Sequence, residues 1–302
     1  LAGLPWSEVL LAVYPNVGTN NGELPQEMRL VDPSDGDDLL AASGTVVLLD
    51  DLLASASVLL APTELSATAP LKLLAKRLGF RGATLPDFRR EMIPALALDW
   101  DAVDARVREL SVLLERASAA RIEFEVAGAV ESLRLDLRFR SAHASGGILR
   151  TPGTVGNLPS GEAYIVPYEG ERAGEPSQSA GTLPVMLDGE LVRYRIVDNR
   201  AIEVLSSGPR SDRERAALTA EPAYGNLAEL GLGVLGAWGI RAIGSTLLDE
   251  KLGLHIAFGR SDHFGGAVGP SDFHDPAKVV HIDRVYVAEC QPGILLRSVV
   301  LE

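Results

Sequence analysis

The sequence predicts a fold with both α/β and α+β character: a small N-terminal α/β sheet domain over residues 1–120, and a mixed-sheet domain over residues 121–302. Three observations predict it. Short apolar runs alternate with a helical segment in the first part, and a strongly amphipathic segment spans residues 100–119. After that segment, apolar and charged residues alternate, as in strands with one exposed face.

Short apolar runs between turn residues predict strands of the first domain at residues 8–13, 45–49 and 57–61. Residues 70–78 have helical spacing, and Gly79 follows as a stop signal. This alternation predicts a small, mostly parallel sheet with helices. The Asn- and Gly-rich segment 17–23 lacks the spacing of a dinucleotide or P-loop motif, so we expect a surface turn there.

The clearest helix covers residues 100–119, where apolar residues recur at three-to-four spacing: Val103, Val107, Leu110, Leu113 and Leu114. Residues 121–128 and 133–139 then alternate apolar and charged side chains, which predicts an antiparallel pair with a solvated face. We therefore place the domain boundary near residue 120. Further on, residues 191–205 predict a hairpin around Asp198 and Asn199, and residues 211–219 a short polar helix.

Composition limits the classes of function. The chain has 302 residues, 46% hydrophobic and 23% charged, which is ordinary for a soluble globular protein. Its formal charge of −13 repels nucleic acid and anionic lipid, so we expect neither as a partner. The single cysteine, Cys290, excludes an intramolecular disulfide and a cysteine-based metal cluster, and we expect a reducing, cytoplasmic location.

We expect neither a signal peptide nor a membrane span in the first residues of this sequence. No basic residue precedes Arg29, and the apolar run near the start is too short for a signal peptide or a membrane span. Because the sequence begins with Leu1 and not with Met, we expect the natural N-terminus to extend further.

Histidines and carboxylates gather in apolar segments of the last third. In VVHIDRVY, His281 and Asp283 stand two apart on a predicted strand, so both face one side. LHIAFG places His255 in a second strand, and AELGLG places Glu229 at the head of a third. Upstream, Glu162 follows a Pro-Ser-Gly turn, where an exposed loop acid is the ordinary interpretation. Buried strands rarely carry such groups unpaired, and a metal ion would pair them.

Three sets of roles are open for these five residues. Two divalent cations would exceed the charge of three carboxylates by one, which a hydroxide balances, and water bound to such ions has a pKa of about 7 and becomes a nucleophile. One iron would use His255, His281 and Asp283 as a facial triad of two histidines and one carboxylate. Without metal, the groups form buried ion pairs in a non-catalytic binding protein.

Ordered sequence blocks add a resemblance to a family. The blocks NLPSGEAYIVPYEG, ELGLG, LDEKLGLHIAFG, GG and VVHIDRVY resemble successive blocks of the aminopeptidase T and AmpS type of metallo-aminopeptidase, a family that also includes the 2,5-dihydroxypyridine dioxygenases. The resemblance covers residues 151–286 and continues more weakly upstream. It implies two domains, homodimers that enclose the active sites, and two divalent ions, usually zinc or cobalt. Carried over by residue, it implies a ligand set of Glu162, Glu229, His255, His281 and Asp283.

The chain also departs from the family pattern. The family tyrosine about seven residues after the HIAFG histidine falls on Asp262, so this group is absent or replaced. Asp262 and His263 are the candidates to replace it, and we give the catalytic role to His263. The triplet that follows the ELG block is replaced, since Val234 and Leu235 follow Gly233. The N-terminal domain is shorter than in typical relatives.

Together, these features predict a two-metal hydrolase that removes N-terminal residues from peptides or opens a related small amide, with Glu162 or Glu229 taking the proton of the attacking water. The LDEK residues Asp249, Glu250 and Lys251 are candidates for supporting the ligands or binding a substrate amine. The alternative is a mononuclear Fe(II) ring-cleaving dioxygenase. The resemblance implies that such enzymes lack an acid at the position of Glu162 and have histidine at that of Glu229, so both glutamates favour the hydrolase.

Overall fold

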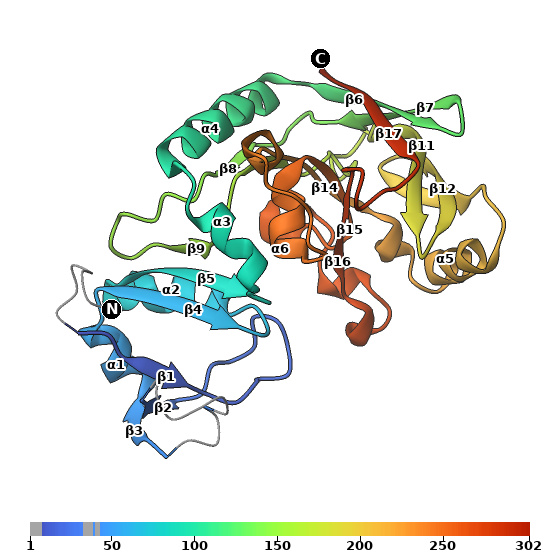
Figure 1. Cartoon of the computed structure of the whole chain (residues 1–302). Coiled ribbons are helices and arrows are strands. Elements are labelled where there is room, and N and C mark those ends of the chain that lie inside the picture. Colours follow the sequence, from blue (N-terminus) through green and yellow to red (C-terminus); the bar gives the residue numbers. More distant parts are fainter. Residues whose placement is uncertain (1–7, 33–38, 40–42) are drawn as a thin grey trace. The chain divides into compact units, whose positions relative to one another are not determined.

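The computed structural model describes residues 8–32, 39 and 43–302. Residues 1–7, to which the expectation about the natural N-terminus applies, lie outside these ranges. Contacts group the described chain into two compact units (Figure 1): residues up to Arg90 together with Leu149–Leu158, and Glu91–Ile148 together with Pro159–Glu302. The division therefore lies about thirty residues before the boundary drawn at residue 120, because the helix at 100–116 packs on strands of the second unit.

The first unit contains two three-stranded sheets instead of one. The antiparallel sheet has the order β1 (Leu11–Val13), β2 (Glu27–Val31) and β3 (Thr45–Leu48). The parallel sheet has the order β4 (Val58–Thr63), β5 (Arg81–Pro86) and β9 (Val155–Asn157). The predicted parallel sheet thus forms only in part, since the unpredicted strand β2 lies between β1 and β3 and pairs antiparallel with both.

Two helices complete the first unit, α1 (Leu49–Ser55) and α2 (Thr68–Leu78). Helix α2 ends as predicted at Gly79, which has a φ of 84°, a left-handed conformation that glycine adopts without strain. The core of this unit is apolar and is formed by residues that include Leu53, Leu71, Ala75 and Phe80.

The second unit is built from two antiparallel sheets. The five-stranded sheet has the order β16 (His281–Val285), β15 (Leu254–Gly259), β14 (Leu227–Gly233), β10 (Glu162–Ile165) and β8 (His143–Ser145). The six-stranded sheet has the order β13 (Arg200–Val204), β12 (Glu190–Val197), β11 (Ala180–Leu187), β7 (Ala129–Asp136), β6 (Ala119–Val126) and β17 (Ile294–Leu301). The predicted fold class is confirmed, since sheets and helices occur in both units.

Several local predictions for this unit are confirmed. Strands β6 and β7 form the antiparallel pair, and β12 and β13 form the hairpin, with positive φ of 48° and 66° at Asp198 and Asn199. The short polar helix is α5 (Pro209–Ala220). The remaining helices are short: α3 (Ile93–Leu96), α6 (Thr246–Asp249) and the 3-10 turns Arg90–Met92, Pro222–Gly225, Leu235–Trp238, Glu250–Leu252, Asp262–Phe264, Pro270–Asp272 and Pro276–Lys278.

Helix α4 (Trp100–Arg116) is the predicted amphipathic helix. The Asp99 side chain caps it by accepting hydrogen bonds from two backbone amides of the first turn, at 3.1 and 3.2 Å. The buried residues of the helix are Val103, Val107 and Leu114. Leu113 belongs to the same apolar pattern but is 50% exposed, so only a narrow stripe of the helix is buried. Within the described ranges, none of the helices has the length and apolarity that crossing a membrane requires.

The five-stranded sheet has one apolar and one polar face. On the apolar face, the Phe258 ring lies 5.2 Å from that of Tyr194 in the six-stranded sheet. Ala163, Ile165, Leu230 and Ile256 share this face by strand alternation and are completely buried. The opposite face therefore carries the residues one position out of phase, which include the predicted metal ligands.

A β-bulge in β14 sets which residues reach the polar face. Leu227 pairs with Phe258 of β15, but Glu229 pairs with Ala257, so the fully buried Ala228 is one extra residue in β14. As a result, Leu227 and Glu229 point to opposite faces although they stand two apart. The bulge places Leu227 in the core and Glu229 on the polar face.

Candidate metal centre

All five predicted ligands lie on the polar face of the five-stranded sheet. Glu162 comes from β10, Glu229 from β14, His255 from β15, and His281 and Asp283 from β16. Their strands are neighbours, and the register of the pairs puts all five side chains on one face. The structure therefore brings together residues that span 122 positions of the chain.

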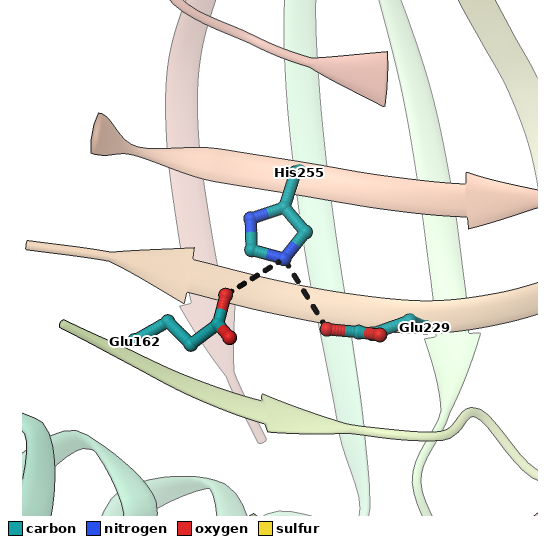
Figure 2. Close-up of side chains that lie close together, drawn as sticks. All are labelled: Glu162, Glu229 and His255. Carbon is teal, nitrogen blue, oxygen red and sulfur yellow. Dashed lines mark hydrogen bonds and ion pairs between the residues drawn. The ribbon is translucent and has the colours of Figure 1, made fainter. Parts of the chain in front are cut away.

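His255 lies at the middle of the group. Its Nε2 is 3.2 Å from Glu229 Oε1 and 3.4 Å from Glu162 Oε2, as Figure 2 shows. The side chain is 1% exposed, and Nδ1 is 3.4 Å from the Gly253 carbonyl oxygen. Its ring lies across β14 because residue 231 is glycine: a Cβ there would be 1.9 Å from His255 Nε2. Gly231, the first glycine of the ELGLG block, thus leaves the space that the His255 imidazole occupies.

His281 forms the second half of the group. Its Nε2 is 3.3 Å from Glu229 Oε2 and 3.7 Å from Asp283 Oδ1. Its Nδ1 lies 2.7 Å from the Arg260 carbonyl oxygen, to which an Nδ1–H donates. In the neutral imidazole this hydrogen bond leaves the Nε2 lone pair free on the side of Glu229.

The donor atoms fall into two sets that could each hold a metal ion. One comprises Glu162, Glu229 and His255, and the other Glu229, His281 and Asp283; within each set the donor atoms lie within 4.8 Å of one another. Glu229 belongs to both and turns one oxygen toward each histidine. Nitrogen and carboxylate oxygen donors of this kind suit zinc, cobalt or iron.

An unsatisfied atom supports the fit to a cation. Glu162 Oε2 is buried and accepts no hydrogen bond, and its charged neighbour is His255 Nε2 at the longer distance of 3.4 Å. A buried carboxylate oxygen without a donor is costly, and a cation bound there would offset that cost. The residues present therefore fit a metal.

The LDEK segment contributes unequally. Lys251 is 3% exposed, and its Nζ donates to Glu162 Oε1 at 2.5 Å and to Glu250 Oε1. Asp249 instead accepts hydrogen bonds from the backbone amides of Ile243 and Gly244, both at 2.9 Å. Lys251 and Glu250 thus adjoin the metal centre, whereas Asp249 fixes a turn. In the sequence, the position of LDEK a few residues before HIAFG indicates that its residues could lie near the candidate metal centre.

The metal-free cluster stabilises protonated histidines. Burial would lower the pKa of His255, but Glu229 and Glu162 outweigh it and raise the pKa to about 9. Burial opposes protonation of His281 too, yet Asp283 and Glu229 raise its pKa to about 11. Both imidazoles therefore carry protons at neutral pH, and a metal must displace them.

The acids show the complementary shifts. Burial would raise the pKa of Glu229 and of Asp283, but hydrogen bonds from the histidines hold both below their usual range. Burial would lower the pKa of Lys251, but the adjacent Glu162 and Glu250 raise it above its usual range. Glu229 and Asp283 are thus ionised and able to bind a cation.

His263 lies at the edge of the centre. Its ring centroid is 5.1 Å from that of His281, and its Nδ1 is 3.6 Å from Asp262 Oδ1. Burial and the positive charges of His281 and Arg260 lower its pKa to about 4, so the imidazole is neutral at pH 7. Asp262 itself accepts from Arg260 Nε at 2.5 Å. Neither residue belongs to the two donor sets.

Two residues that the sequence analysis did not name, Tyr164 and Glu169, lie at or near the edge of the candidate metal centre. Tyr164 shares the face of Glu162, and its ring lies 5.0 Å from those of His143 and Phe264. The buried Glu169 accepts hydrogen bonds from the loop that carries His263 and from its surroundings, through Asn226, Ser261, Ala267 and Arg140. Tyr164 and Glu169 both stand in the NLPSGEAYIVPYEG block, where only Glu162 had been singled out.

Comparison with known proteins gives a likeness of fold. No protein-family model matches the chain, and no curated protein sequence does. The structure is similar to that of a 2,5-dihydroxypyridine dioxygenase from Pseudomonas putida KT2440, with a TM-score of 0.55 and 16% identity over 84% of this chain and 75% of that one. Wild-type AmpT from Thermus thermophilus is less similar, with a TM-score of 0.46 and 17% identity over 78% and 72% of the two chains. At such identities, the chain shares the dioxygenase's fold, and its activity must be argued from its own residues.

Proposed function

We propose that this protein is a metal-dependent hydrolase that removes N-terminal residues from peptides or opens a related small amide. The observation that carries the proposal is Glu229, whose two oxygens face different histidines and thereby join two donor sets. A carboxylate shared between adjacent donor sets is the arrangement expected for a pair of ions. The proposed ligands are Glu162, Glu229, His255, His281 and Asp283.

The proposed chemistry assigns roles to residues of the centre and its rim. Two bound divalent ions, zinc or cobalt in this proposal, would acidify a water and polarise the substrate carbonyl. Glu162 or Glu229 would accept the proton of that water. The neutral His263 has Nδ1 near Asp262, so Nε2 is the nitrogen available to a substrate at the rim.

A mononuclear iron dioxygenase is the second candidate, and the likeness of fold to the Pseudomonas putida enzyme is what favours it. Its ligands would be His255, His281 and Asp283. In the described part of the chain, these three residues do not form one donor set, because Glu229 lies between the two histidines. The geometry therefore supports the hydrolase better.

Metal content and two substrates test the proposal together. Metal-free protein is reloaded with Zn²⁺, Co²⁺ or Fe²⁺, and the number of ions per chain is measured. Hydrolysis is then assayed with an aminoacyl p-nitroanilide, and oxygen uptake is assayed with 2,5-dihydroxypyridine. We expect two ions per chain and hydrolysis with Zn²⁺ or Co²⁺. Less than one ion per chain, or iron-dependent oxygen uptake without hydrolysis, would reject the hydrolase.

Glu229→Gln separates the two candidates. If Glu229 is shared by two ions, this variant loses both, whereas an iron held by His255, His281 and Asp283 would stay bound. Glu203→Gln is the matched control, because Glu203 is an exposed glutamate of β13 whose partner is Arg195. The control should keep the wild-type metal content.

The proposal includes the assembly and location of the protein. We propose a cytoplasmic homodimer that acts on peptides or small molecules. We also propose that it binds neither nucleic acid nor membrane, and the net charge of −13 supports both of these exclusions. Sedimentation equilibrium of the metal-loaded protein tests the dimer, and a monomer at all concentrations would reject it.

A further inference from the structure

Lys251 is a buried cation inside the proposed metal centre. It lies in the 3-10 turn Glu250–Leu252, directly before β15, and is 3% exposed. Its Nζ lies between two carboxylates, donating to Glu162 Oε1 at 2.5 Å and to Glu250 Oε1. The turn approaches β14 closely because residue 233 is glycine: a Cβ there would be 2.2 Å from the Lys251 carbonyl carbon. The close approach of this turn to β14 thus places the Lys251 ammonium beside Glu162.

The position between Glu162 and Glu250 needs a positive group. Their side chains are 9% and 16% exposed, and two acids brought together in such surroundings repel each other unless a cation or a proton lies between them. An ammonium and a divalent ion are alternative occupants, because both bind carboxylate oxygens at short distance. Only one of them fits between the same two oxygens.

We infer that the Lys251 ammonium is a fixed cation of the metal centre, which fills the position between Glu162 and Glu250 and keeps a divalent ion from binding there. Oε2 is then the Glu162 oxygen that has no hydrogen bond, and it lies 3.4 Å from His255 Nε2. The number of ions that the centre binds is therefore set partly by a lysine. This inference rests on the proposed metal centre but not on the reaction proposed for it.

Removal of the ammonium should raise the number of bound ions. Wild type, Lys251→Ala and Lys251→Ala/Glu250→Gln are equilibrated with Mn²⁺, and the ions per chain are measured by elemental analysis. We expect Lys251→Ala to bind one Mn²⁺ more than wild type and to gain more in melting temperature from Mn²⁺. The double variant, which lacks the second carboxyl group as a ligand, should return to the wild-type number. Lys278→Ala, at an exposed lysine, is the matched control and should not change the number.

Each outcome decides the inference. A number for Lys251→Ala equal to or below that of wild type overturns it, as does an extra ion retained in the double variant. If wild type binds Mn²⁺ but hydrolyses no amide, and Lys251→Ala binds one ion more, the proposed function fails while the inference stands; if wild type binds no Mn²⁺, both fail. If wild type binds two and Lys251→Ala binds two, only the inference fails.

A measurement on the wild type keeps the inference testable if Lys251→Ala does not fold. In crystals of the wild-type protein loaded with Mn²⁺, anomalous scattering locates every bound ion. We expect Lys251 Nζ between Glu162 and Glu250 and no anomalous peak there. A Mn²⁺ ion that bridges these two carboxylates, with Lys251 displaced, would overturn the inference.

Discussion

Gly231→Ala should perturb the proposed metal centre without changing any proposed ligand residue. A Cβ at this position would lie 1.9 Å from His255 Nε2, 2.1 Å from Cε1 and 2.7 Å from Cδ2. Ordinary contact begins near 3.4 Å, so the imidazole must withdraw by about 1.5 Å. Since Nε2 starts 3.2 Å from Glu229 and 3.4 Å from Glu162, this shift takes it out of reach of both carboxylates.

The expected losses follow from that displacement. Losing a buried, charge-assisted hydrogen bond costs about 1.5–3 kcal/mol, so the free energy of unfolding of the metal-free protein should fall by roughly 2 kcal/mol. An ion held by Glu162, Glu229 and His255 loses one of its three ligands. Loss of an outer-shell partner alone weakens metal binding about 10- to 100-fold, so we expect at least ~100-fold here, or about 2.7 kcal/mol.

Competition with a chromophoric chelator measures the affinity, and urea unfolding measures the stability. Gly253→Ala is the control, because this glycine also adjoins β15, but its Cβ would meet a single atom, Val287 Cγ1, at 3.2 Å. We expect the control to bind metal within about twofold of the wild type, on the basis that surface-like changes rarely exceed ~0.5 kcal/mol. Wild-type affinity and ion number in Gly231→Ala would refute the placement of His255 across β14.

Three further predictions concern protonation and the rim. The raised pKa values of His255 and His281, about 9 and 11, mean that their stabilising interactions are complete below pH 6.5 and are lost as the pH rises through those values. The melting temperature of the metal-free protein should therefore fall from pH 7 to pH 11, and a rise would contradict this charge assignment. Metal uptake at pH 7.5 should release protons, seen as a heat that depends on the buffer's ionisation enthalpy; a buffer-independent heat would show that the histidines were already neutral. Glu169→Gln should speed hydrogen exchange at the Ala267 amide at least ~10-fold with unchanged metal content, while Glu171→Gln, which keeps the Ala267 contact, should not.

The helices and hairpins that were predictable depend on local patterns. Helix α4 follows from the apolar spacing between Val103 and Leu114, and the β12–β13 hairpin follows from Asp198 and Asn199, which tolerate positive φ. The grouping of His255, His281 and Asp283 followed from the alternation of side chains along strands together with the resemblance. Their role as ligands stays a prediction.

What could not be predicted depends on contacts distant in sequence. Strand β2 (Glu27–Val31) has an ordinary composition, and only its pairing with β1 and β3 makes it a strand. Helix α4 belongs with the second unit because it packs on β8 and β10, and no pattern within the helix states this. The sequence makes Lys251 a candidate for supporting the ligands or binding a substrate amine, but it does not predict the burial of this lysine. Lysines are rarely buried, and the approach of Glu162 from 89 residues away explains the burial of this one.

The extra residue in β14 restricts how this chain can change over evolutionary time. Leu227 and Glu229 face opposite sides only because Ala228 interrupts the pairing with β15. Deletion of Ala228 itself would restore regular pairing and leave Leu227 and Glu229 on opposite faces, whereas deletion of a regularly paired residue such as Leu230 would exchange the faces of every residue on one side of it. The segment from Glu229 to Gly233 should therefore tolerate substitutions far better than insertions or deletions. Among relatives of this protein, we expect its length to be more constant than its sequence.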